Sequence, residues 1–106
     1  MAPSSPLIFR KNTLVEKHQI EGNDPPGRSF SRMVMITRTA TGYTAKVQYE
    51  SITAETPSFP TIADALRHLV GQLQKMAFIR LRTRLNFRGK KYYAEKEAWV
   101  DYPDPA

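Results

Sequence analysis

This chain has 106 residues, a formal net charge of +6 and no cysteine. The length allows one small domain, and the lack of cysteine excludes disulfides, thiol redox chemistry and cysteine metal sites. No apolar run approaches the roughly 20 residues of a membrane helix, and the N-terminus lacks the apolar segment of a signal peptide. We therefore expect a folded, cytoplasmic protein.

Residues 1–29 are expected to form a flexible N-terminal tail, followed by a single domain over residues 30–106. The run 21–27 holds two adjacent prolines and two glycines, which neither a helix nor a central strand accommodates. Two short apolar clusters, Leu7–Phe9 and Leu14–Val15, either dock as an edge strand or stay mobile until a partner binds. Unanchored termini favour the mobile state.

The domain is predicted to begin with a β-hairpin. Arg32–Arg38 is rich in strand-forming residues, and Tyr43–Tyr49 alternates between two faces with Tyr, Ala, Val and Tyr on one of them, as a half-buried strand does. The short, glycine-containing connection Thr39–Gly42 is typical of a hairpin. Residues 51–56 either extend the second strand or add a short third one.

An amphipathic helix is predicted next. Thr61 and Asp64 form a variant of the capping box, and Pro60 excludes an earlier start. From Ile62 to Ala77 the apolar residues recur at positions i, i+3, i+4 and i+7, which predicts one apolar face that a sheet must cover.

The segment Ile79–Arg88 places apolar residues at odd positions and arginines at most even ones. This period of two predicts a strand with one buried face and one charged face. No acidic residue occurs between Asp64 and Glu95, and residues 78–106 carry seven basic and four acidic groups. A polyanion would therefore be attracted most strongly to this part of the chain.

A second hairpin is expected to follow, and its turn must have an even length. An odd-length turn would place Glu95 and Glu97 over the core, where unpaired charge is costly. A two-residue turn at Gly89-Lys90 pairs Arg84 with Glu95 and Arg82 with Glu97, and a turn one residue earlier shifts both acids along the strand. In either register the acids lie on the arginine face.

Two interpretations of the arginine face remain open. Either the arginines serve only as cross-strand ion pairs, or they form a surface for an anionic ligand. Aromatic rings among arginines are typical of sheets that bind single-stranded nucleic acid; Trp99 either stacks on such a ligand or packs at the edge of the core. The candidate surface consists of Arg80, Arg82, Arg84, Arg88, Lys90, Lys91, Tyr93 and Trp99.

Residues with catalytic potential are sparse. Asp64 and His68 are spaced to interact on the helix, but they point away from its apolar face and are expected to be a solvated pair. No zinc-binding spacing, nucleophile motif or phosphate-binding loop occurs in the chain. We therefore expect no enzymatic activity, no cofactor and no metal site.

Together these elements predict an α+β domain with the order β-β-α-β-β, in which one amphipathic helix packs on one face of a mostly antiparallel sheet. The expected function is that of a small non-enzymatic binding protein associated with nucleic acid. The alternative is a protein–protein interaction module, with an acidic protein surface as partner. Neither role involves a membrane.

The run from Gly42 to Val47 and the run from Phe59 to Leu66 form strands followed by a capped helix. In this order they resemble the antitoxin half of HicA/HicB toxin–antitoxin pairs. The resemblance concerns topology, it does not extend to the C-terminal arginine hairpin, and it implies no site residues. Within the second interpretation it implies an antitoxin-like or adaptor role.

Overall fold

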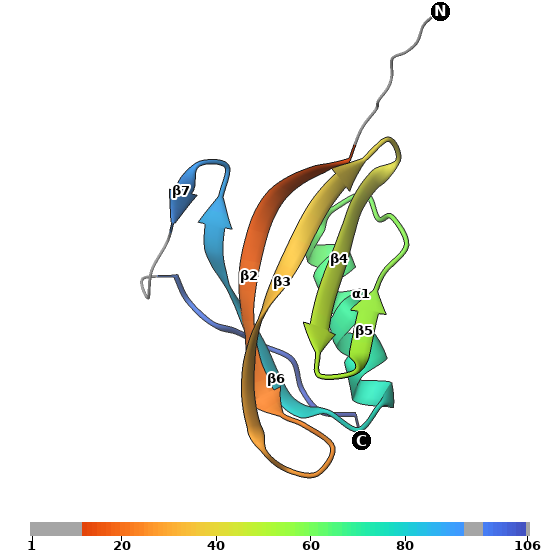
Figure 1. Ribbon diagram of the computed structural model, residues 1–106, viewed down its shortest axis with the longest axis vertical. Helices are drawn as coiled ribbons and strands as arrows, with labels where there is room; N and C mark the ends of the chain where they lie inside the picture. The colour runs from red at the N-terminus through yellow and green to blue at the C-terminus, as the bar shows by residue number, and fades with distance from the viewer. Residues whose placement is uncertain (1–11, 93–96, 106) are drawn as a thin grey trace, which may run out of the picture.

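The computed structural model describes residues 12–92 and 97–105. It contains one helix and seven strands, with short strands at the C-terminal end of the chain (Figure 1). In chain order the elements are β2 (Thr13–Asn23), β3 (Ser29–Thr39), β4 (Gly42–Tyr49), β5 (Ile52–Glu55), α1 (Ile62–Lys75), β6 (Ile79–Arg88), β7 (Lys91–Tyr92) and β8 (Val100–Asp101).

All strands belong to one antiparallel sheet with the spatial order β5-β4-β3-β2-β6, and both β7 and β8 pair with β6. The chain runs through β2 to β5 as a meander, crosses the sheet as α1, and returns as β6 beside β2. Figure 1 shows α1 behind β4 and β5, while the hairpin of β6 and β7 lies at the other edge of the sheet, on the left of the view. This arrangement confirms the predicted α+β class.

The prediction of a flexible tail over residues 1–29 is wrong for the part of it that the structure describes. Strand β2 pairs with β3 along one edge and with β6 along the other, so it lies inside the sheet. Its inward positions include Glu16 and His18, and these polar residues hide the alternation of a half-buried strand from a search for apolar periodicity. The domain therefore begins well before residue 30, whereas residues 1–11 lie outside the described part of the chain.

The predicted N-terminal hairpin and the predicted helix are both confirmed. Strands β3 and β4 pair across a turn that starts and ends with Thr39 and Gly42, and residues 52–55 form a separate strand β5. Helix α1 begins at Ile62, and the Oγ1 of Thr61 accepts a hydrogen bond from the backbone N–H of Asp64 at 3.1 Å. This bond satisfies one of the free N–H groups at the helix start.

The core lies between α1 and the sheet, mostly on β3, β4 and β5, and Ile20 of β2 and Leu81 of β6 also belong to it. Three aromatic rings pack together at the end of the core next to the last residue of β4: the ring centroids of Phe30, Tyr49 and Phe78 are 5.1 to 5.7 Å apart. Full burial of one apolar side chain of this size stabilises the fold by about 1.5–3 kcal/mol. The other members with the least exposure are Ile20, Val34, Ile36, Ala45, Ala65, Leu69, Val70, Leu73 and Leu81.

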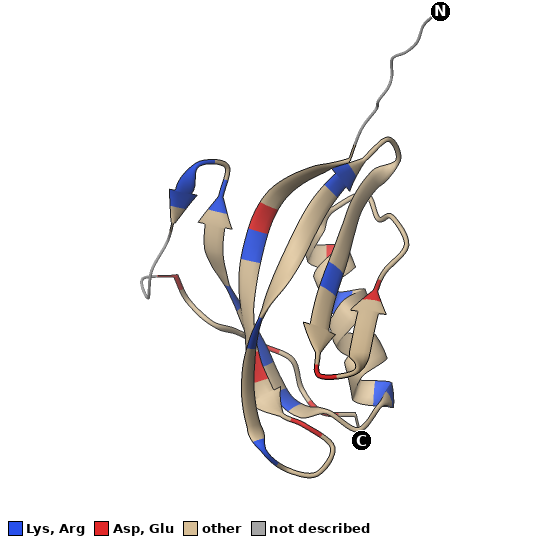
Figure 2. Ribbon diagram, viewed as in Figure 1, with Lys and Arg blue, Asp and Glu red and all other residues tan. Residues whose placement is uncertain are grey.

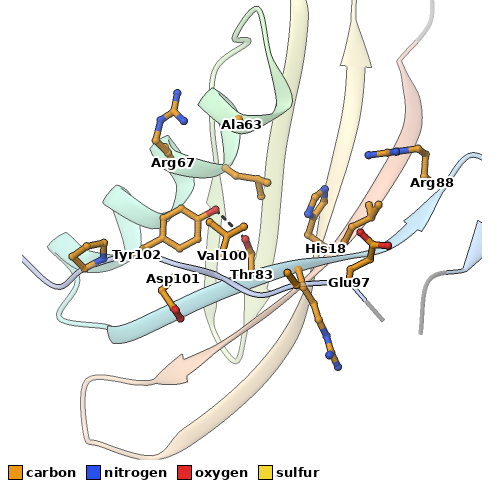
Figure 3. Close-up of a pocket in the computed structure, with 14 residues that line it drawn as sticks. His18, Ala63, Arg67, Thr83, Arg88, Glu97, Val100, Asp101 and Tyr102 are labelled. Atoms are coloured by element: carbon orange, nitrogen blue, oxygen red, sulfur yellow. Dashed lines mark hydrogen bonds between the residues drawn. The ribbon is translucent and has the colours of Figure 1, made fainter. Parts of the chain in front are cut away.

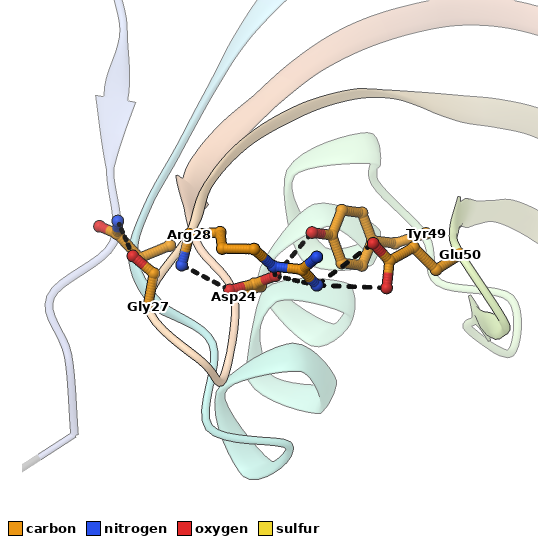
Figure 4. Close-up of polar contacts among 6 residues, drawn as sticks. Asp24, Gly27, Arg28, Tyr49 and Glu50 are labelled. Carbon is orange, nitrogen blue, oxygen red and sulfur yellow. Dashed lines mark hydrogen bonds and ion pairs between the residues drawn. The ribbon is translucent and has the colours of Figure 1, made fainter.

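A buried carboxylate holds the loop between β2 and β3 (Figure 4). Asp24 accepts hydrogen bonds from the backbone N–H and the Nε of Arg28 and from the hydroxyl of Tyr49, each at 2.7 Å. Burial by itself would raise the pKa of Asp24, but these hydrogen bonds outweigh it and hold the pKa below its ordinary value of 3.8. Arg28 also pairs with Glu50 at 3.2 Å, so the loop is tied to the end of β4.

In the described part of the chain, no helix is both long enough and apolar enough to cross a membrane.

Candidate functional site

The middle of β6 has the two faces that its sequence predicts. Leu81, Thr83 and Leu85 are buried on the side of the sheet that faces α1. Arg82 and Arg84 lie on the opposite side, which we call the outer face, and both are partly exposed. Within residues 12–92 and 97–105, no helix packs on the outer face, so these two arginines border solvent.

A β-bulge at each end of β6 breaks the alternation. At the start of β6, Glu21 pairs with Arg82 but Asn23 pairs with Ile79, and Arg80 adopts a left-handed conformation with φ 56°. Arg80 is therefore out of step with the other arginines, and Ile79 lies on the outer face with 40% of its surface exposed. The expectation that Arg80 continues the arginine face is wrong for this reason.

Strand β2 approaches this bulge closely at Gly22. A Cβ on Gly22 would lie 2.7 Å from the carbonyl oxygen of Ile79 and 2.8 Å from a methyl group of Leu81. Both distances are shorter than van der Waals contact, so the bulge requires glycine at this position.

The second bulge turns Arg88 to the other face of the sheet. Lys17 pairs with Phe87, whereas His18 pairs with Leu85, which leaves Asn86 as the extra residue. Arg88 consequently lies opposite Glu16 on the α1 side, and its Nε donates to the Glu16 carboxylate at 2.8 Å. The predicted surface of four arginines therefore contains only two in the structure.

Trp99 brings these two arginines together. Strand β8 pairs Asp101 with Arg82 and Val100 with Thr83, which places Trp99 on the outer face. Its ring lies 4.1 Å from the guanidinium carbon of Arg82 and 4.3 Å from that of Arg84. These are cation–π contacts, and we call the three residues the tryptophan–arginine cluster.

The acidic partners predicted for these arginines differ from those observed. Arg82 donates to the Glu21 carboxylate at 2.9 Å, and Arg84 donates to the Gln19 amide oxygen at 3.2 Å. Both partners come from β2, the strand that was expected to be a tail. The predicted pairing of Arg82 with Glu97 is wrong because Asp101 occupies that position, while Glu95 lies outside the described residues.

The predicted even length of the turn is confirmed, and of the two turns that the sequence left open the structure has the one at Gly89-Lys90, because Arg88 pairs with Lys91 in β7. Lys90 and Lys91 are both exposed at this turn. Next to it, the Phe87 ring packs against the Tyr92 ring with centroids 4.9 Å apart, and the Lys17 Nζ lies 5.4 Å from the Phe87 centroid. Tyr93 lies outside the described residues.

The outer face also carries apolar and basic side chains from the centre of the sheet. Met33 and Met35 are each 38% exposed, and the exposed Lys46 pairs with Met35 across β3 and β4. Figure 2 shows basic positions along β6 and at its turn to β7. The carboxylate of Glu21 lies next to Arg82, so the outer face is mixed in polarity, with cations at the tryptophan–arginine cluster.

Two buried polar residues on the α1 side escaped the sequence analysis. His18 and Glu16 are 9% and 7% exposed, and the Nε2 of His18 lies 2.7 Å from the Oε1 of Glu16. Burial lowers the pKa of His18 below its ordinary value of 6.5, and the hydrogen bond to Glu16 and its charge offset this only in part. Glu16, His18 and the apolar Ile20 fall at alternate positions, and this period of two is the signal that could have identified them.

The predicted pair on the helix does not form. Asp64 makes an ion pair with Arg67, and the ring of His68 packs on the ring of Phe59 with centroids 4.8 Å apart. Both residues therefore have structural partners.

Comparisons of this chain with models of protein families, with curated proteins and with solved structures found no match.

Proposed function

We propose that this chain is a non-enzymatic binding protein whose outer face binds single-stranded nucleic acid. The observation that supports this most is the tryptophan–arginine cluster on the face of the sheet opposite α1. Guanidinium groups pair with phosphates, and flat aromatic or guanidinium surfaces stack on unpaired bases. The cluster combines both kinds of contact within one short stretch of the sheet.

The two arginines differ in how much charge they offer to a phosphate. Arg82 faces a carboxylate, that of Glu21, whereas Arg84 donates to the neutral amide of Gln19. When Arg84 binds a phosphate, it gives up a hydrogen bond to a neutral amide, whereas Arg82 would have to give up an ion pair. We infer that Arg84 contributes more to affinity than Arg82 does.

Other groups extend this surface on both sides of the cluster. Lys17 and Phe87 lie towards the β6–β7 turn, where Lys90 is exposed. Met33 and Met35 supply an exposed apolar strip on β3, which lies beyond β2. A strand of nucleic acid that crosses β6, β2 and β3 would thus meet cations for its backbone and apolar surface for its bases.

The test is the binding of a fluorescently labelled oligothymidylate at several salt concentrations. We expect affinity to fall as salt rises, with a slope of about 0.7 per phosphate contacted. The double variant Arg82→Ala/Arg84→Ala should reduce this slope by about 1.4, and Trp99→Leu should weaken binding by about 1–3 kcal/mol.

A matched control removes the same charge elsewhere. Arg67→Ala/Lys75→Ala takes two cations from α1, on the other side of the sheet, and should change affinity much less than the double variant on β6. Equal losses in the two double variants, or no salt-dependent binding by the wild-type chain, would contradict the proposal.

The exposed methionines support the second candidate, a protein–protein interaction module. An apolar strip in the middle of an uncovered sheet is a feature of protein interfaces. If this is the function, the oligonucleotide will not bind, and Met33→Ser/Met35→Ser will weaken association with a protein partner or a second copy of the chain, measured by sedimentation velocity.

A further inference from the structure

The side of the sheet that faces α1 contains a cavity next to the helix. Five adjacent strands at about 4.8 Å spacing span roughly 20 Å, whereas a helix with its side chains is about 10 Å wide. Helix α1 packs mainly on β4 and β5, so it leaves part of β2 and β6 uncovered. The C-terminal segment 97–103 lines the remaining space, and the cavity between these elements measures about 480 Å³ (Figure 3).

The wall of the cavity is mostly apolar. Its apolar members are Ala63, Leu66, Leu85, Ala98, Val100 and Pro103. The hydroxyl of Thr83 is buried in the wall, but it is already hydrogen-bonded to the Tyr102 hydroxyl at 2.9 Å. Small-molecule sites typically have volumes of about 300–1,000 Å³, apolar walls and a few polar groups that converge on the ligand. In size and in wall, this cavity therefore resembles a small-molecule site.

The cations at the opening of the cavity are already paired. Arg88 donates to the Glu16 carboxylate at 2.8 Å, and Arg67 forms an ion pair with Asp64. An anionic ligand would have to break one of these pairs, and the carboxylate that it displaced would then repel it. The opening therefore does not select for a ligand with negative charge.

Other charged residues of the wall add no cation to the cavity. The guanidinium of Arg84 lies on the outer face, 4.3 Å from the ring of Trp99. Asp101 is paired with Arg82 in the sheet and therefore shares the outer face with it. Glu97 also lines the opening, and no ion pair joins it to another residue in the described part of the chain. This carboxylate disfavours an anion further.

The polar group that the cavity offers to a ligand is the imidazole of His18, which points into it (Figure 3). The Nε2 of His18 lies 2.7 Å from one oxygen of Glu16, and the other oxygen of Glu16 accepts from Arg88. A carboxylate held by an arginine stays ionised and can only accept, so we assign the proton of the neutral imidazole to Nε2. The Nδ1 is then an acceptor, and no residue in the described ranges 12–92 and 97–105 donates to it.

The neutral form of His18 is the one that a ligand meets at pH 7. Burial lowers the pKa of His18 below its ordinary value of 6.5, and the hydrogen bond to Glu16 and its charge offset this only in part. The imidazole therefore presents a lone pair, and not a proton, to the cavity. A carboxylate cannot bond to it, whereas an N–H or O–H group can.

We propose that this cavity binds a small uncharged molecule, with an apolar body against the wall and one N–H or O–H group that donates to the Nδ1 of His18. The apolar body matches the wall, the donor matches the acceptor, and the lack of charge matches an opening whose cations are paired. This site lies on the opposite side of the sheet from the tryptophan–arginine cluster, and it does not depend on the proposed nucleic-acid function.

The donor of the ligand sets how tightly it binds. An apolar molecule without a donor would separate the Nδ1 of His18 from water and leave this nitrogen without a hydrogen bond, which costs free energy. A molecule with a donor replaces the hydrogen bond to water with one of its own. We therefore expect two otherwise equal ligands, one with the donor and one without, to differ about tenfold in dissociation constant.

An NMR titration of the isotope-labelled chain with two isomers tests the need for a donor. Skatole carries its methyl group on carbon and keeps the indole N–H, whereas N-methylindole has the same atoms, a similar shape and no donor. Skatole should bind about tenfold more tightly and should shift the amide signals of His18, Leu85 and Val100, which line the cavity. No binding of skatole, or equal binding of the two isomers, would overturn the proposal.

Two charged relatives of skatole test whether the ligand is uncharged. Indole acetate carries a carboxylate and tryptamine an ammonium group on the same ring carbon, and both keep the ring N–H. We expect both to bind more weakly than skatole. The carboxylate meets paired cations and Glu97, and the ammonium group loses more by giving up water next to an apolar wall than it gains from Glu97. Tighter binding of either one would refute an uncharged ligand.

Three variants test the location of the site, and thermal unfolding shows whether each is folded. His18→Phe keeps a ring but removes the acceptor, so skatole and N-methylindole should bind it equally. Ala63→Trp fills the cavity from α1 and should abolish skatole binding, whereas Ala40→Trp, in the exposed β3–β4 turn, should bind skatole like the wild type.

The cavity is not the site if folded Ala63→Trp binds skatole normally, or if folded His18→Phe keeps the preference for skatole. Oligonucleotide binding separates this proposal from the proposed function. It uses the outer face, so Ala63→Trp should leave it unchanged, and its failure in the wild-type chain would not affect the binding of skatole.

Discussion

The two halves of the sheet face on the α1 side are built differently. Beneath α1, the strands present Val34, Ile36 and Val47 to the helix, and the interior is apolar and closely packed. Beside α1, the same face carries Glu16 and His18, and the structure is hollow. A single helix can cover only part of a wide sheet. The core continues to Ile20 and Leu81 on β2 and β6, and it is interrupted next to Glu16 and His18.

This difference shows where the fold obtains its stability and where it has room for a ligand. The packed half contributes most of the burial of apolar surface, and that burial is the main favourable term in folding. In the half beside the helix, part of the interior is occupied by the polar network of Glu16, His18 and Arg88. Such a network contributes little net stability. The following predictions test this division, from the largest expected effect to the smallest.

The largest effect is expected in the packed half. Phe78 is 1% exposed and contacts the rings of Phe30 and Tyr49. Phe78→Ala should lower the free energy of unfolding by about 3–5 kcal/mol, because it removes apolar contacts and leaves a cavity. Denaturation by urea measures this change, and a loss below about 1 kcal/mol would show that the packed half is not the main source of stability.

The second effect concerns the seam where β2 meets β6. Gly22→Ala should lower the free energy of unfolding by about 1–3 kcal/mol, because the new Cβ would collide with the carbonyl of Ile79. Gly71→Ala is the matched control: a Cβ on Gly71 meets nothing within 4 Å, and α1 should gain up to about 1 kcal/mol. The comparison fails if both substitutions change stability in the same direction.

The third effect depends on pH and lies at the loop between β2 and β3. Because the folded-state pKa of Asp24 is below 3.8, its contribution to stability is complete above that pH and is lost as the pH falls through the folded value. Asp24→Asn should therefore be less stable than the wild type at pH 7, and this difference should shrink below about pH 4. Thermal unfolding across pH 3 to 7 measures it; a constant difference would contradict the assigned role of the carboxylate.

The smallest effect is expected in the hollow half. Val100 lines the cavity and is 54% exposed, so Val100→Ala should lower the free energy of unfolding by less than about 1 kcal/mol. The same urea measurement applies. A loss approaching that of Phe78→Ala would mean that the segment 97–103 is part of the main core.

Local sequence patterns predicted several elements correctly. Helix α1, with its start at Ile62, and the hairpin of β3 and β4 follow from apolar periodicity, a capping threonine and a short turn. The even length of the turn after β6 is also as predicted, although the glutamates used to argue for it do not occupy the positions opposite β6 that the argument assumed. Each of these depends on residues that are close together in the chain, so the sequence itself contains the necessary information.

The tertiary structure decided where the remaining residues lie, because their partners are distant in the chain. Pairing with β3 and β6 turns an apparent tail into the strand that holds Glu16 and His18. Two bulges, which arise only when β6 is matched to β2, remove Arg80 and Arg88 from a face that strict alternation assigned to them. Side-chain direction along a strand changes with every inserted residue, and the sequence of one strand does not record where its neighbour requires an insertion.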